Sequence, residues 1–126
     1  MDFRIEAQLP ATAAQLWAVF FDVHRVAGLI PGCEAVEEVE PLKAYSAVMK
    51  QRIGIFKLEV PTRITVERST FEREVALHAM GRDKLTATLI DMHLTVVLDE
   101  RADAVPPACG IALEAHLQVA GRLASL

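Results

Sequence analysis

Two histidines and a carboxylate are the side chains in this sequence best suited to hold a metal ion. His93 falls opposite His116 if the loop between their predicted strands is centred near residue 104, and Asp91 lies two residues from His93 on the same face. Imidazole nitrogens and carboxylate oxygens are zinc ligands. That face otherwise carries Glu114 and Gln118, and the spacing fixes no further ligand. We therefore interpret it as a solvated sheet surface and predict no metal or other cofactor.

A second group of polar residues interrupts a strand face that is otherwise apolar. It includes Gln51, Thr86 and the pair Thr62 and Thr88, which the predicted strand register places on either side of Leu77. A few polar groups in an apolar pocket orient the carbonyl or hydroxyl of a ligand. The hydroxyls could equally bond the backbone. The sequence leaves both interpretations open.

Arg73 shares the alternation of that apolar face. An unpaired guanidinium is too costly to bury, so we expect Arg73, like Gln51, at the rim of any cavity. There it could meet an oxygen or a headgroup of a ligand. The interpretation that we favour is that it reaches water or an acidic neighbour.

The remaining candidates for a nucleophile or base lie in contexts that favour structural roles. His24 lies beside Arg25 on a predicted helix without a paired acid, and no serine follows the nucleophile-elbow pattern. Cys33 and Cys109 are far apart and lack metal or redox spacing. We interpret both as reduced thiols, as in a cytoplasmic protein, and predict no catalytic residue.

Two short helices are predicted after an N-terminal strand at 3–9. Thr12 and Gln15 fit a capping box at the start of the first helix, and Asp22 is placed to cap the second. The second helix stops at the Pro-Gly pair 31–32. The apolar face of the first helix comprises Ala13, Leu16, Trp17 and Phe20, and that of the second Val23, Val26, Ala27 and Ile30. Two short helices cannot bury these faces on each other alone, so they need a sheet beside them.

Alternation of apolar and polar residues predicts further strands at 33–40, 45–53, 56–67, 71–80, 86–98 and 109–119. We expect turns at 54, 69–70 and 81–84 and a loop at 100–108. The resulting register pairs Val60 with Met49 and Ala79, Ile64 with Val75, Val75 with Ile90, and Leu94 with Ala115. One face of the antiparallel meander is then almost wholly apolar. A strand, two helices and a long meander define the α+β fold class.

Chain length, net charge and the distribution of apolar residues limit the classes of protein to which this sequence can belong. The 126 residues favour a single domain covering 1–126. The formal net charge of −4 and the lack of a basic cluster argue against nucleic acid as a partner. The sequence has no run of about 18 apolar residues, and its N-terminus lacks the basic start and apolar centre of a signal peptide. We expect a cytoplasmic protein.

Several residues, in their order along the chain, give it a family likeness. They are Trp17, Asp22, the sequence Pro-Gly-Cys-Glu at 31–34, Tyr45, the turn at 53–54, Gly81 and Gly121. With them the chain resembles the carbon monoxide dehydrogenase CoxG family, within the START-like, polyketide-cyclase-like (SRPBCC) group of helix-grip folds. The resemblance covers nearly the whole chain. It implies a curved sheet of about seven antiparallel strands around a long C-terminal helix, with a hydrophobic cavity between them.

The sequence departs from this pattern at its end, because Leu126 lies where the long helix should begin. We expect either a truncated form of the domain or an apolar sheet face that a partner subunit or a second copy of the chain covers, since so large an apolar patch is rarely left in water.

Periodicity alone favours a plain core for the apolar face, whereas the resemblance implies that this face lines a ligand cavity. The cavity residues predicted on this basis lie on the first helix and on the inner strand face. They are Trp17, Tyr45, Met49, Phe56, Leu58, Val60, Thr62, Ile64, Val75, Leu77, Thr88, Ile90, Met92, Leu94, Leu113 and Leu117, with Arg73 and Gln51 at the rim.

The resemblance implies a non-catalytic accessory factor of a molybdenum hydroxylase such as carbon monoxide dehydrogenase. Such a factor binds an apolar lipid or quinone-like molecule, or helps to recruit the enzyme to the inner face of the membrane. One alternative is a polyketide cyclase or aromatase, which needs polar or ionisable groups inside the cavity. Another is an interaction module completed by a partner subunit. The inner face holds no histidine or carboxylate of the right alternation, which favours binding.

Overall fold

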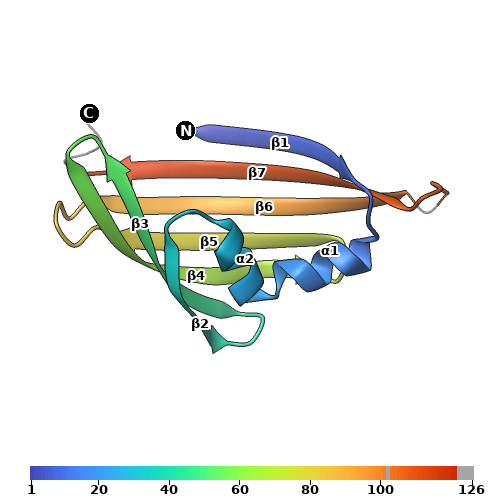
Figure 1. Ribbon diagram of the computed structural model, residues 1–126, viewed down its shortest axis with the longest axis horizontal. Coiled ribbons are helices and arrows are strands. Elements are labelled where there is room, and N and C mark those ends of the chain that lie inside the picture. The colour runs from blue at the N-terminus through green and yellow to red at the C-terminus, as the bar shows by residue number, and fades with distance from the viewer. Residues whose placement is uncertain (102, 122–126) are drawn as a thin grey trace.

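The computed structural model describes residues 1–101 and 103–121, which form one seven-stranded antiparallel sheet and two helices. The strand order is β1-β7-β6-β5-β4-β3-β2, so β1 and β2 form the edges of an open sheet (Figure 1). The elements are β1 (Asp2–Leu9), α1 (Ala13–Phe20), α2 (Val23–Leu29), β2 (Cys33–Glu40), β3 (Ala44–Ile53), β4 (Phe56–Thr70), β5 (Glu74–Arg82), β6 (Leu89–Arg101) and β7 (Ala108–Ala120). The predicted α+β class is confirmed.

Both helices begin at the caps that the sequence predicts. The Thr12 hydroxyl accepts a hydrogen bond from the Gln15 N–H at 3.1 Å, and the Gln15 side chain accepts one from the Thr12 N–H at 2.9 Å. Asp22 accepts from the Arg25 N–H at 3.3 Å at the start of α2. The Ala13 N–H donates to Glu100 Oε1 at 2.9 Å, so the N-terminus of α1 is tied to the end of β6.

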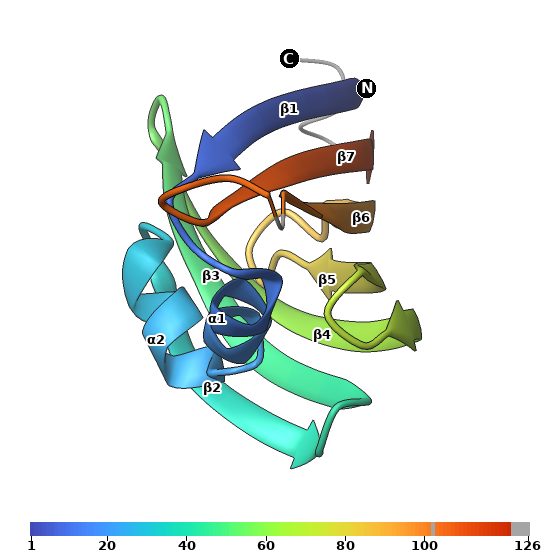
Figure 2. The same cartoon turned by 90° about the vertical axis from the view of Figure 1, so that its right-hand side faces the viewer.

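The sheet curves around the two helices, which lie on its concave side (Figure 2). The buried core beneath α1 consists of Ala13, Val75, Val96, Leu98 and Cys109. Leu16, Trp17 and Phe20 of α1 pack against it from one side, and Leu77, Leu94, Ile111 and Leu113 belong to the sheet. The helices therefore cover one half of the concave face, and the opposite ends of β5, β6 and β7 extend beyond them (Figure 1).

The predicted strand register is confirmed between β3 and β4 and between β6 and β7, and it is wrong between β4 and β5 and between β5 and β6. Val60 pairs with Met49, and Leu94 pairs with Ala115. Between β4 and β5, Ile64 pairs with Ala79, four residues beyond the predicted Val75. Val60 consequently does not pair with Ala79. Between β5 and β6, Val75 pairs with Val96, six residues beyond the predicted Ile90.

The two errors arise at turns that the sequence does not mark clearly. β4 continues through the Ser-Thr pair to Thr70, with a bulge between Val66 and Arg68, and the chain reverses at 71–73. Gly81 and Arg82, which were predicted to lie in the next turn, instead form the end of β5. Both shifts are even, and side chains alternate with a period of two, so the predicted inner residues that lie within paired strands, such as Ile64, Val75 and Leu94, stay on the inner face.

A buried carboxylate organises the connection from β5 to β6. Asp83 is 1% exposed. One of its oxygens accepts from the Glu59 N–H at 2.7 Å, and the other accepts from the N–H groups of Leu85 and Thr86 at 3.1 and 2.7 Å and from the Thr86 hydroxyl at 2.8 Å. Burial by itself raises the pKa of Asp83, but these hydrogen bonds outweigh it and lower the pKa below its usual value.

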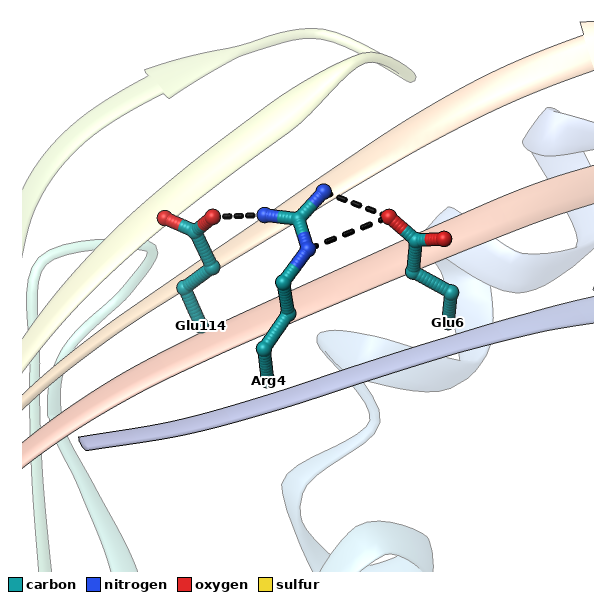
Figure 3. A network of polar contacts seen from close by, with 3 residues as sticks. All are labelled: Arg4, Glu6 and Glu114. Atoms are coloured by element: carbon teal, nitrogen blue, oxygen red, sulfur yellow. Dashed lines mark hydrogen bonds and ion pairs between the residues drawn. The ribbon is translucent and has the colours of Figure 1, made fainter.

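The edge strand β1 is held to β7 by a charged contact on the outer face. The Arg4 guanidinium bridges Glu6 on its own strand and Glu114 on β7, with Arg4 Nε at 3.1 Å from Glu6 Oε1 (Figure 3). All three side chains are exposed, so the contact aligns the edge more than it stabilises it. The long helix that the resemblance implies after the last strand would lie outside the described residues.

Candidate functional site

The candidate site is the apolar face on the concave side of the sheet. Strand pairing aligns its residues in rows across β4, β5, β6 and β7. One row is Val66, Leu77, Leu94 and Ala115; the next is Ile64, Ala79, Met92 and Leu117; the third is Thr62, Gly81, Ile90 and Val119. Val66, Leu77 and Leu94 pack against the buried core, which places all three rows on the side of the helices.

Burial divides this face into two halves. Val75, Val96, Leu98 and Cys109 lie beneath α1 and are buried. In the second and third rows every residue is only partly buried except Val119, which is exposed. The second half is therefore an apolar surface that the described residues leave partly open to solvent.

Aromatic side chains line one end of the covered half. The Trp17 ring lies 4.9 Å from the Phe21 ring and 6.0 Å from the Phe71 ring, measured between centroids. Phe71 belongs to the β4–β5 turn and is 72% exposed. Trp17 thus bridges the first helix and a turn of the sheet, with an edge-to-face contact to an aromatic ring that reaches solvent.

A hollow with a volume of about 600 Å³ opens beside this aromatic cluster. Its walls come from the start of α1, the β4–β5 turn and the end of β6. They are formed by Ala13, Phe71, Glu72, Arg73, Leu98, Asp99 and Glu100. Arg73 is exposed there and makes no ion pair with any carboxylate of the described residues. A lining that combines apolar side chains with charged ones suits a ligand that has both an apolar part and a polar end.

The polar residues of the predicted cavity are already engaged. The Thr62 hydroxyl donates to the Val60 carbonyl oxygen at 3.0 Å, and Gln51 Nε2 donates to the Pro31 carbonyl oxygen at 2.8 Å. The Tyr45 hydroxyl accepts from the Leu42 N–H at 3.2 Å. Burial raises the pKa of Tyr45. The interpretation that these groups bond the backbone is the one that the hydrogen bonds support.

The predicted juxtaposition of Thr62 and Thr88 around Leu77 is wrong. Leu77 lies between Val66 and Leu94. Thr88 precedes β6, is 1% exposed, and shares a hydrogen bond of 2.7 Å between its hydroxyl and that of Thr86. The shifted register and the Asp83 connection together remove it from the strand face.

The other predicted cavity residues all lie on the concave side or on α1, at different depths. Tyr45, Leu58, Val60 and Val75 are buried. Trp17, Met49, Phe56, Thr62, Ile64, Leu77, Ile90, Met92, Leu94, Leu113 and Leu117 are partly buried, and both rim residues, Gln51 and Arg73, are exposed. Phe71 and the acidic residues of the hollow, Glu72, Asp99 and Glu100, were not predicted from the sequence to belong to the site.

The outer-face histidines are arranged differently from the sequence interpretation. His93 pairs with His116 across β6 and β7, as predicted. His116, however, bonds Asp2 of the edge strand. His93 stacks on His78 of β5 instead, with ring centroids 4.2 Å apart. The histidine beside Asp91 and His93 is therefore His78, which the predicted register had kept apart from them.

A curved antiparallel sheet that holds two short helices on its apolar concave side defines the helix-grip class of START-like (SRPBCC) proteins. The sequence model of the carbon monoxide dehydrogenase CoxG family matches residues 6–126. The chain belongs to this family.

Solved structures confirm the fold. A conserved protein from Geobacillus kaustophilus is similar over 100% of this chain and 79% of its own, with 17% identity and a TM-score of 0.85. The Zhui aromatase/cyclase from Streptomyces sp. R1128 is similar over 97% of this chain and 70% of its own, with 15% identity and a TM-score of 0.66. No curated protein matches the chain. Neither helix of the described residues has the length and hydrophobicity that a bilayer crossing requires.

Proposed function

We propose that this protein binds an apolar small molecule, lipid-like or quinone-like, between the concave sheet face and its helices. In this role it is a non-catalytic accessory factor of a molybdenum hydroxylase such as carbon monoxide dehydrogenase. The observation that carries the proposal is the concave apolar face, which is partly open at one end and, beyond the buried core beneath α1, meets a hollow of about 600 Å³ at the other. The family name supports the choice of partner enzyme.

The binding energy comes from the removal of apolar surface from water. Ile64, Met92 and Leu117 share one row of the partly open half, and a ring or chain laid across them loses water on one side. Each buried methylene contributes about 0.8 kcal/mol. Arg73 at the mouth of the hollow is placed to meet a carbonyl or headgroup oxygen.

A cyclase or aromatase is less well supported by this geometry. The rows of the concave face contain no histidine or carboxylate among the described residues. Their hydroxyl groups, Thr62 and Tyr45, are already engaged in hydrogen bonds with the backbone. Of the carboxylates that line the hollow, Asp99 and Glu100 are exposed to water. General acid–base chemistry on an enclosed substrate requires a titratable group aimed into the cavity.

The same face also suits delivery at a membrane. An apolar surface that is open on one side can take a molecule from lipid without unfolding the core. We infer a peripheral and transient contact with the inner face of the membrane, in which the exposed Phe71 beside the hollow enters the headgroup region.

Binding is tested by native mass spectrometry of the protein purified from cells and by titration with a menaquinone analogue. Trp17, the single tryptophan of the chain, reports occupancy through its fluorescence. We expect saturable quenching and a co-purified apolar molecule. A protein without co-purified lipid and without saturable quenching would overturn the proposal.

A matched pair of variants locates the site. Ile64→Gln places an amide on the concave face, and Arg63→Gln places the same side chain one residue away on the outer face. We expect Ile64→Gln to weaken binding at least tenfold and Arg63→Gln to leave it unchanged, with both circular dichroism spectra native-like. Equal affinities would place the ligand elsewhere.

A further inference from the structure

A second site lies on the opposite, outer face of the sheet and is independent of the proposed function. His78 of β5 and His93 of β6 are a direct cross-strand pair. Their rings are parallel to within 4°, with centroids 4.2 Å apart. Asp91 precedes His93 by two residues and therefore points to the same face. Backbone register alone brings two imidazoles and a carboxylate together.

The donor atoms of these three residues converge. Asp91 Oδ1 lies 2.8 Å from His78 Nε2 and 3.6 Å from His93 Nε2. One donor atom from each residue lies within 4.8 Å of the others. Zinc bonds to nitrogen and oxygen measure about 2.0–2.2 Å, which separates tetrahedral ligand atoms by roughly 3.3–3.5 Å. Because the two rings are stacked in parallel, they must tilt out of the stack for both Nε2 lone pairs to face one ion.

A fourth residue, Glu67, contacts the other ring nitrogen of His93. Glu67 Oε1 lies 3.1 Å from His93 Nδ1. A carboxylate in this position accepts the Nδ1 proton and leaves the Nε2 lone pair facing Asp91 and His78. Metal-binding histidines are commonly oriented in this way by a carboxylate on their other nitrogen.

The charges of the site are also those of a cation site. Within residues 1–101 and 103–121, the ion pairs of Asp91 and Glu67 are with histidines only. The two carboxylates bring negative charge to the site, which a divalent ion would neutralise. The side chains of His78, Asp91 and His93 are 26%, 32% and 50% exposed, so an ion can enter and water can complete its coordination.

We propose that His78, Asp91 and His93 bind a divalent transition-metal ion of the zinc class, with Glu67 as the positioning residue for His93. Two imidazoles and one carboxylate with an open position suit zinc and its neighbours in the first transition row. A bound ion would link β5 to β6 directly, and β4 to them through Glu67, on the face opposite the apolar site.

The test is calorimetric titration of the full, untagged chain with Zn²⁺ after dialysis against a chelator, repeated with Co²⁺ to record its visible spectrum. We expect one ion per chain and a higher melting temperature when zinc is bound. His78→Gln and His93→Gln should abolish saturable binding, and Glu67→Gln should weaken it about tenfold or more. Binding should also weaken from pH 7.5 to pH 5.5, because imidazole must be neutral to ligate.

His116→Gln is the matched control, because His116 lies on the same face opposite His93 but bonds Asp2. It should bind zinc like the parent chain. Absence of stoichiometric binding in the parent chain would overturn the proposal. So would binding that survives both His78→Gln and His93→Gln, or that is lost in His116→Gln while all variants keep their circular dichroism spectra.

Discussion

At the scale of single residues, Asp83 has the most demanding environment of the described acids. It is almost fully buried, and four hydrogen bonds from Glu59, Leu85 and Thr86 converge on its two oxygens. The ionised form accepts all four, whereas an amide in the same place turns one acceptor into a donor. A buried polar group that loses its partner costs about 1–3 kcal/mol.

Asp83→Asn should therefore lower the free energy of unfolding by about 1–3 kcal/mol at pH 7. The folded pKa of Asp83 lies below the unfolded value of 3.8, so this stabilisation is present above pH 3.8 and is lost as the pH falls through the folded pKa. Urea unfolding at pH 7 and at pH 3 measures the difference, which should shrink in acid. A constant difference would contradict the assignment; Asp99→Asn, at an exposed acid, is the control.

The two threonines that the sequence placed together should respond differently to the same change. Thr88→Val removes a hydroxyl that is buried and bonded to Thr86, and we expect a loss of about 1–2 kcal/mol in chemical denaturation. Thr62→Val alters the partly open face and should change quinone-analogue affinity while costing less stability. The reverse order of stability losses would mean that Thr88 does not support the β5–β6 connection.

At the scale of elements, the sequence predicts which face each side chain takes but not which residues pair. Alternation is a local property that survives any even shift, so Ile64, Val75 and Leu94 lie on the predicted face. Register depends on where turns form, and the bulge after Val66 and the buried Asp83 leave no distinct local signal. The same error separated His78 from His93 and hid the outer-face cluster. Caps at Thr12 and Asp22 were predictable because their chemistry is local.

Alanine substitutions at two glycines near the α2–β2 connection should change the stability of the protein in opposite directions. Gly32 has φ +80°, and a Cβ there would lie 2.0 Å from the Lys50 carbonyl oxygen. Gly32→Ala should destabilise by more than about 1 kcal/mol, because of backbone strain and a clash with backbone. Gly28, inside α2, has open space around it, so Gly28→Ala should stabilise by about 0.5–1 kcal/mol. Thermal unfolding compares them, and equal shifts would contradict the geometry.

At the scale of the whole molecule, the class of fold was predictable and the depth of the site was not. A strand, two helices and a meander limit the architecture to few arrangements, and the family likeness selects one. The division of the apolar face into a covered half and a partly open half depends on where the two short helices pack on the sheet. The hollow beside Phe71 forms from three segments that are distant in sequence, so no local sequence pattern predicts it.

The partly open half should bind a dye that fluoresces on apolar surfaces. We expect enhanced 1-anilinonaphthalene-8-sulfonate fluorescence at neutral pH in a protein that keeps its near-ultraviolet circular dichroism and unfolds cooperatively. These two features distinguish a native apolar face from a molten globule. A menaquinone analogue should displace the dye. A native protein that does not enhance the dye would show that this face is covered in solution.

The pairing of β1 with β7 bears on how the chain is made. About a hundred residues separate Leu9 from its partner Cys109, and at roughly 5–20 residues per second a ribosome needs on the order of 5–20 s to span them. During that time β2 to β6 can pair successively, each with the strand before it, as they emerge. β1 remains unpaired until β7 has been made. Its Phe3 and Ile5 are exposed even in the finished fold, so until β7 emerges this strand presents both an unpaired edge and apolar side chains to solvent.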